Sequence, residues 1–192
     1  IGCALCPSLS LVVNDIDFTR PGDGCYPDFP DAHKRELERA CISLPKAREA
    51  GVKFMLGSDA GFAVTPYGEW HARELEHYVK YLGFSPAETL KCATVNNGSF
   101  VREDGQVGVL ATGRLADILA IDGDPLADIS ILQDRSRIRR IIQGGETIEL
   151  EINKSVRRLR SEFSYNMWSD VYTQARIDEI GMAPSLNQRA AE

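Results

Sequence analysis

The residue in this sequence with the clearest chemical potential is Asp59, in the segment Gly57-Ser58-Asp59-Ala60-Gly61. The mainly apolar residues 52–56 precede this segment and predict a short buried strand. A carboxylate just beyond the carboxyl end of a parallel strand lies where α/β barrels place reactive groups, and small neighbours let a ligand approach the backbone. Such a group can bind a metal ion or transfer a proton. Because an Asp in a turn is more often only a turn former or helix cap, this position needs support from the rest of the sequence.

The three histidines are the other candidates for metal or proton chemistry. They are His33, His71 and His77, and all fall on predicted helices or at a helix start. We expect His33 and His77 to face solvent. His71 lies just beyond the loop that follows Gly61 and is a candidate substrate contact, as is Gly61 itself. Tyr67 could also hydrogen-bond substrate, although a packed loop aromatic is the more frequent alternative.

The five cysteines are scattered along the chain, and their odd number fits a reducing compartment such as the cytoplasm better than a disulfide framework. Cys3 and Cys6 form a C-x-x-C that could be a redox pair or half of a zinc site. However, no second pair stands at a matching distance, and on a strand the two side chains point to opposite faces. We therefore expect buried structural thiols.

The elements around these residues alternate between helix and strand signals. Residues 2–13 are mostly apolar and predict a buried strand, and the Asp-, Pro- and Gly-rich residues 14–30 predict a long loop. Asp31 can cap the next helix, which Pro45 should kink or restart and Gly51 should end. This order of elements is typical of α/β proteins with a parallel sheet.

Two further helices are predicted before the pattern changes. The first runs from about Glu69 to Leu82, and the second begins at the capping box Ser85-Pro86-Ala87-Glu88 and stops near Asn96. Beyond residue 105, short β-like segments are separated by turn residues, which predicts a small all-β unit. These segments are 107–111, 115–121, 137–142 and 147–152.

Several segments together resemble the amidohydrolase superfamily, in its branch of imidazolonepropionase-like and Xaa-Pro-dipeptidase-like enzymes. Their order and spacing over about residues 45 to 145 carry the resemblance more than any one segment does. The segments are Ala47-Arg48-Glu49-Ala50-Gly51-Val52-Lys53, Gly57-Ser58-Asp59-Ala60-Gly61, Thr65-Pro66-Tyr67-Gly68, Ala72-Arg73-Glu74-Leu75-Glu76, Ser85-Pro86-Ala87-Glu88-Thr89-Leu90 with Ala93-Thr94, Gly113-Arg114-Leu115-Ala116-Asp117-Ile118, and Asp122-Gly123-Asp124-Pro125-Leu126-Ala127-Asp128-Ile129.

The resemblance implies an α/β fold that is the C-terminal part of a (β/α)₈ TIM barrel. Residues 1–103 then correspond to the last two β/α units, with 52–56 as the eighth strand, and residues 104–152 correspond to a segment of a small β-sandwich. Residues 153–192 are charged and weakly periodic. We interpret them as a C-terminal helical extension that packs on a neighbour or on another subunit, which fits a homo-oligomer.

The resemblance also implies a site for one or two divalent metal ions, usually zinc, and a small-molecule substrate. In this family a His-x-His on the first strand, a carboxylated Lys or Glu on the fourth, and histidines on the fifth and sixth hold the metal. The eighth-strand Asp, here Asp59, contacts the metal and the attacking water. A divalent metal lowers the pKa of bound water toward neutrality and polarises the scissile carbonyl. Asp59 would accept the proton of the water and pass it to the leaving nitrogen.

This sequence departs from the family pattern in its histidines and in one loop. It contains no His-x-His, relatives often have His where Tyr67 stands, and the stretch from Gly68 to Ala72 is one residue longer here. A catalytic zinc needs about three protein ligands, which one Asp does not provide. We therefore expect the N-terminal barrel half to come from the same polypeptide or from a separate chain.

The overall composition excludes some classes of partner. The chain has 192 residues, a formal net charge of −6, and 43% hydrophobic and 26% charged residues, which is typical of a soluble globular protein. Its basic residues gather on no readable face, and no apolar run approaches the roughly 18 to 20 residues of a spanning helix. Both observations argue against nucleic acid and membranes as partners. The N-terminal residues also lack the pattern of a signal peptide.

The sequence thus predicts the C-terminal part of a metal-dependent hydrolase that cleaves a C–N bond in an amide, cyclic amide, carbamate or dipeptide. The missing histidines favour an alternative, which is a non-catalytic assembly subunit or degenerate homologue of the same fold. A self-contained small-molecule binding module is a third interpretation, and the open edge of a quarter-barrel disfavours it.

Overall fold

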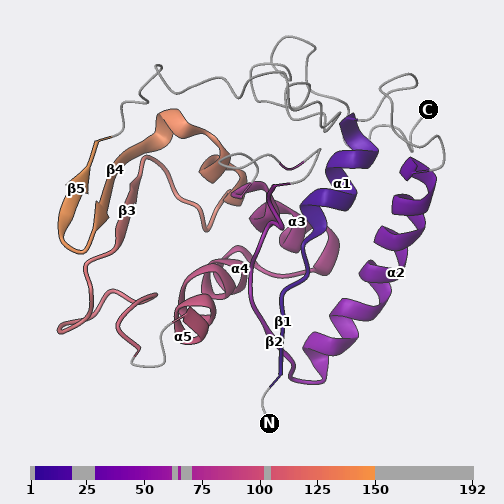
Figure 1. Cartoon of the computed structure of the whole chain (residues 1–192), viewed down its shortest axis with the longest axis horizontal. Coiled ribbons are helices and arrows are strands. Elements are labelled where there is room, and N and C mark those ends of the chain that lie inside the picture. Colours follow the sequence, from indigo (N-terminus) through magenta and orange to yellow (C-terminus); the bar gives the residue numbers. More distant parts are fainter. Residues whose placement is uncertain (1–2, 19–28, 62–64, 66–70, 102–104, 150–192) are drawn as a thin grey trace, which may run out of the picture.

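The computed structural model describes residues 3–18, 29–61, 65, 71–101 and 105–149. Two sheets organise this part of the chain, a parallel pair β1–β2 and an antiparallel sheet in the order β3-β4-β5. Figure 1 shows the parallel pair in the middle, with α1 and α2 on one side of it and α4 and α5 on the other. This mixed arrangement agrees with the predicted α/β class.

The parallel pair is short, but it fixes where the chain can place reactive groups. β1 (Ala4–Leu5) pairs with β2 (Lys53–Phe54), and the ladder continues where Met55 N–H donates to Leu5 O at 2.8 Å. Because the strands run in the same direction, the chain leaves both of them at the same end of the sheet. Residues that follow Leu5 and Phe54 are therefore neighbours.

The predicted strand over 2–13 is wrong beyond β1. Residues Leu9–Phe18 form a helix, α1, which also takes up the first part of the loop predicted over 14–30. Its buried apolar residues recur at helical spacing, a period that the dense apolar run obscures in the sequence. They are Leu9, Val12, Val13 and Ile16. The remainder of the predicted loop, 19–28, lies outside the described residues.

The long helix α2 (Phe29–Glu49) contains Pro45 in its interior and runs through it, so the predicted restart does not occur. Pro45 removes only its own N–H from the helix, and the apolar face of Ala40, Cys41 and Leu44 packs against the core on the turn before it. Gly51 follows the end of α2 and has a positive φ of 81°, as expected for a helix terminus.

Helix α3 (Arg73–Leu82) begins after residue 72 rather than at Glu69, and residues 66–70 lie outside the described part of the chain. Its core face meets β2, where the rings of Phe54, Tyr78 and Phe84 pack with centroid separations of 5.3 to 6.4 Å. The predicted capping box before α4 (Pro86–Lys91) is confirmed, because Glu88 N–H donates to Ser85 Oγ and Ser85 N–H donates to Glu88 Oε2.

The helix does not stop near Asn96. It passes through a π-helical turn (Cys92–Asn96) into α5 (Asn97–Val101). Asn96 Nδ2 donates to Phe54 O at 2.7 Å, and the Asn97 amide accepts from Leu56 N–H at 3.0 Å and donates to Leu56 O at 2.7 Å. Backbone groups alternate in direction along a strand, so these bonds lie on the edge of β2 that faces away from β1. Asn96 and Asn97 therefore provide hydrogen-bond partners for the backbone groups on that edge.

The last sheet contains β3 (Ile118–Ile121), β4 (Ile138–Gln143) and β5 (Glu146–Ile148), where three of the four β-like segments were predicted. Residues 107–109 form bends instead, and 110–111 have no regular secondary structure. Two 3₁₀ turns, Ile129–Gln133 and Arg135–Arg137, connect β3 to β4. The assignment of this sheet to a β-sandwich stays a prediction, and the predicted extension 153–192 lies outside the described residues.

None of the helices in the described part of the chain is long and apolar enough to cross a membrane.

Candidate active site

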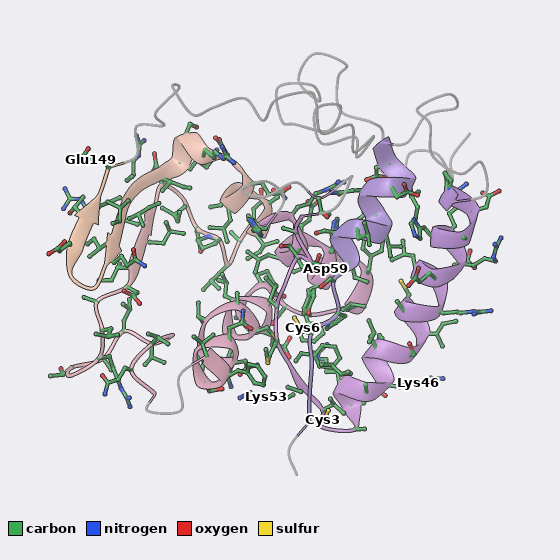
Figure 2. The ribbon with its side chains drawn as sticks, viewed as in Figure 1. Cys3, Cys6, Lys46, Lys53, Asp59 and Glu149 are labelled. Carbon is green, nitrogen blue, oxygen red and sulfur yellow. The ribbon has the colours of Figure 1, made fainter. Side chains whose placement is uncertain are left out.

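Asp59 lies beyond the carboxyl end of β2, with an exposed side chain. Figure 2 shows Asp59 toward the ends of the two strands, with Lys53 and Cys3 toward their beginnings. Asp59 has a φ of 50°, in the left-handed region that few residues other than Gly and Asn or Asp adopt. Such backbone conformations are frequent at functional sites and here set the direction of the carboxylate.

Gly57 allows the two strand ends to approach closely. A Cβ at this position would lie 2.8 Å from Cys6 Sγ, so the space beside Gly57 is filled by the thiol. The sequence suggested that small residues here leave room for a ligand. For Gly57 the room is used by a neighbouring side chain instead.

Beyond Asp59 the chain turns back on itself. Gly61 has a φ of 115°, and its N–H donates to Thr65 O at 2.7 Å. The buried Thr65 donates from Oγ1 to Asp59 O at 3.4 Å. The candidate substrate residue Gly61 is thus an exposed turn residue beside Asp59. Tyr67, the second candidate, lies outside the described residues.

His71, the third candidate, is brought back to the end of β2. Its Nδ1 lies 2.6 Å from Oγ of Ser58, which is buried while His71 is exposed. Ser58 directly precedes Asp59, so the imidazole of His71 and the carboxylate of Asp59 are held by adjacent residues beyond the end of β2. We call this end of the sheet the rim. An exposed imidazole held in this way can contact a ligand at that rim.

Glu74 is a buried carboxylate that sequence analysis did not single out. It accepts hydrogen bonds from Leu9 N–H and from both N–H and Oγ–H of Ser10, at 2.6 to 2.7 Å, and thereby caps α1. Burial raises the pKa of Glu74 to about 7, although these three donors and the charge of Arg73 oppose the rise. No sequence signal identifies this role, because the cap lies more than sixty residues from the helix it caps.

Arg73 extends the polar network along α1. It donates to Asp17 Oδ2 at 2.6 Å and to Asn14 Oδ1. The side chains of Arg73 and Asp17 are only 14% and 5% exposed, so the ion pair is largely removed from water. One turn after Glu74, the Tyr78 hydroxyl lies 2.5 Å from Met55 O and 3.1 Å from Pro7 O. These contacts connect the segments that follow the two strands.

The predicted positions of the other histidines are wrong. His77 is buried, and neither of its ring nitrogens has a hydrogen-bond partner within the described part of the chain. Burial holds the pKa of His77 well below its ordinary value. His33 is partly buried and lies 2.8 Å from Oδ2 of the buried Asp15. His33 lies on the side of α2 that contacts α1, and His77 lies on the buried side of α3. A helical pattern alone does not reveal which side is buried.

The cysteines at the N-terminal end also differ from expectation. Cys3 and Cys6 are exposed rather than buried, because β1 has a neighbouring strand on one edge only within the described residues. Partial burial, followed by the negative charges of Glu74 and Asp59, raises the pKa of the Cys6 thiol.

The sequence also fits the profile of a known family. The profile of the amidohydrolase family matches residues 4–148, which is most of the chain. The chain belongs to the amidohydrolase family. Its solved relatives include prolidase-like enzymes, in agreement with the Xaa-Pro-dipeptidase-like branch, and they show that the parallel strands of this amidohydrolase belong to a TIM-barrel-type fold.

Among curated proteins, the ochratoxinase of Aspergillus niger is 34% identical to this amidohydrolase over 101 residues, which are 52% of this chain and 20% of the relative. The adenine deaminase of Mesorhizobium japonicum is 29% identical over 93 residues, or 48% and 15% of the two chains. This amidohydrolase therefore spans a fifth or less of these curated relatives.

Among solved structures, a protein described as a prolidase from Bifidobacterium longum matches with a TM-score of 0.65 and 31% identity. The match covers 76% of this chain and 35% of that one. Aspergillus niger ochratoxinase matches with a TM-score of 0.61 and 26% identity over 73% of this chain and 30% of that one. About two thirds of each relative thus has no counterpart in these 192 residues.

The described residues of this amidohydrolase do not bring together three His, Cys, Asp or Glu side chains that could hold a metal ion. Asp59 is exposed and reaches the rim from the end of β2, so it is suited to be one ligand of a shared site. A catalytic zinc needs about three protein ligands. Asp59 therefore provides only part of the ligand set that a divalent metal requires.

Proposed function

We propose that this chain is the C-terminal part of a metal-dependent hydrolase that cleaves a C–N bond, with Asp59 as metal ligand and proton shuttle. The single observation that carries the proposal is the exposed Asp59 carboxylate beyond the end of β2 in a chain of the amidohydrolase family. Because the chain spans only part of its relatives, the proposal concerns the complete protein.

In the proposed reaction Asp59 accepts a proton from the attacking water and later donates it to the leaving nitrogen. A bound divalent ion, zinc by our proposal, supplies the acidity of the water and polarises the carbonyl group. Exposure suits Asp59 to this role, because it leaves the carboxylate accessible to a ligand beyond the end of β2. The turn formed by Gly61 and Thr65 restrains the backbone that carries it.

The proposed substrate is a small molecule with an amide, cyclic amide, carbamate or dipeptide bond. Relatives named as ochratoxinase, prolidase and Xaa-Pro dipeptidase support this range, as does a related prolidase solved with N-methylphosphonate-L-proline, 29% identical with a TM-score of 0.60. Gly61, Tyr67 and His71 are the proposed substrate contacts. His71 has the best support, since Ser58 fixes its imidazole beside the rim.

The remaining metal ligands are proposed to come from an N-terminal barrel half, in the same polypeptide or in a separate chain. The outer edge of β1, which faces away from β2, is where the preceding strand would pair. We also retain the division into barrel (1–103), β-sandwich (104–152) and C-terminal extension (153–192), together with a homo-oligomeric cytoplasmic enzyme, as proposals.

The proposal is tested with the full-length protein, or with this chain combined with its N-terminal barrel half. We expect one or two zinc ions per active site by elemental analysis and hydrolysis of at least one member of a panel of Xaa-Pro dipeptides, N-acyl amino acids and cyclic amides. A chelator should abolish turnover, and zinc should restore it. A protein that binds no metal and cleaves none of these substrates would support the non-catalytic subunit instead.

A further inference from the structure

The first two residues of α3, Arg73 and Glu74, form hydrogen bonds to α1 at two places. Glu74 accepts the N–H groups of Leu9 and Ser10, at the beginning of α1. Arg73 donates to Asn14 and Asp17, which lie farther along the same helix. Since a helix rises about 1.5 Å per residue, the two contact regions are separated by roughly 10 Å along α1. Two such contacts fix the direction of a helix as well as its position.

These hydrogen bonds lie in the interior of the protein. Ser10, Asn14, Asp17 and Glu74 are all buried. Removing one member of such a network leaves the others buried without their partners, which is costly. A helix of ten residues is also marginal by itself in water. The conformation of α1 therefore depends on its contacts with α3 and the core.

The same network reaches the candidate active site. α1 begins three residues after Cys6, and the Cys6 thiol fills the space beside Gly57, at the start of the segment that carries Asp59. The Tyr78 hydroxyl is close to the backbone oxygens of Pro7 and Met55, one on each segment that leaves the sheet. The inner face of α3 thus ties the segment after β1 to the segment that leads to Asp59.

We infer that Arg73 and Glu74 are positioning residues, which fix α1 on α3 and so keep the chain that leaves β1 aligned with the Asp59 segment, residues 57–61. The inference rests on the proposed function, because this alignment matters to turnover only where the Asp59 segment meets substrate. Neither residue needs to touch the reacting atoms to act in this way.

The test uses the full-length protein with Arg73→Met, Arg73→Lys and Asp17→Asn, and measures amide hydrogen exchange together with kcat and KM. Loss of a charged hydrogen bond should speed exchange about tenfold or more in residues 9–17 and 57–61 of Arg73→Met. We expect KM to rise more than kcat falls, and Arg73→Lys to recover part of the loss. The double variant Arg73→Met with Asp17→Asn should be no worse than Arg73→Met, because it no longer leaves the Asp17 carboxylate buried without its ion-pair partner.

Arg139→Met is the control, because Arg139 pairs with Asp122 at the surface and should leave both segments unchanged. Wild-type exchange in Arg73→Met would overturn the inference, as would faster exchange in α1 with an unchanged KM. If Arg73→Met does not fold, Asp17→Asn and Arg73→Lys decide by the same criteria. If the wild-type protein hydrolyses nothing, the proposed function fails. Separately, amide exchange that becomes faster in residues 9–17 but not in residues 57–61 would overturn the proposed alignment of α1 with the Asp59 segment.

Discussion

Ser58 Oγ lies 2.6 Å from His71 Nδ1, although the two residues are thirteen positions apart. The contact closes the loop after β2 and attaches an exposed imidazole to the residue that precedes Asp59. The buried hydroxyl of Ser58 therefore helps to hold His71 beyond the end of β2.

Ser58→Ala should weaken substrate binding without abolishing the chemical step. Loss of one hydrogen bond is worth about 1 kcal/mol, which corresponds to roughly a fivefold increase in KM. Steady-state kinetics of the full-length enzyme measure it, and Ser58→Thr, which keeps the hydroxyl, is the control. An unchanged KM in Ser58→Ala would remove His71 from the substrate site.

Gly57→Ala should displace the Asp59 segment, because the new methyl group would meet Cys6 Sγ at 2.8 Å. Overpacking of this kind costs about 1 to 3 kcal/mol of stability. Combining the change with Cys6→Ala removes the clashing sulfur and should restore most of the loss. Thermal unfolding and turnover of the two single variants and the double variant measure the coupling. Additive effects would show that Cys6 and Gly57 are not in contact.

Asn97→Ala should destabilise the protein by about 1 to 3 kcal/mol, because it leaves both backbone groups of Leu56 without their side-chain partner. Lys91→Ala, on α4 and exposed, is the control and should change stability by less than about 0.5 kcal/mol. Urea unfolding of both variants gives the comparison. Equal stability of the two variants would contradict the role given to Asn97.

Glu74 should make stability depend on pH in a defined direction. Its pKa in the folded protein is raised from 4.5 to about 7, so between these values the folded state holds a proton that the unfolded state has released. Stability therefore falls as pH rises from about 4.5 to 7, by up to about 1.4 kcal/mol per pH unit from this group. Urea unfolding across this range should show the decline, and Glu74→Gln should remove this contribution. The same slope in the variant would contradict it.

The sequence predicts the parts of this molecule that depend on local signals. The capping box at Ser85, the strand before Asp59 and the β segments at 118–121, 138–143 and 146–148 need only neighbouring residues to be identified. The rim position of Asp59 follows from the strand before it.

Other parts depend on contacts across long separations. α1 was mistaken for a strand because its apolar residues are nearly continuous, and its cap is supplied by Glu74. His77 is buried by packing that a helical pattern does not encode. The asparagines that satisfy the edge of β2 could be placed only once the π-helical turn was known.

The proton-transfer role of Asp59 is measured most directly by kcat of Asp59→Asn in the full-length, metal-loaded protein. We predict a loss of about 10² to 10⁴-fold with an unchanged unfolding temperature, which is the usual contribution of a positioned acid–base group. Asp124→Asn, at an exposed turn far along the chain, should keep kcat within about twofold. Full turnover in Asp59→Asn would contradict the proposed mechanism.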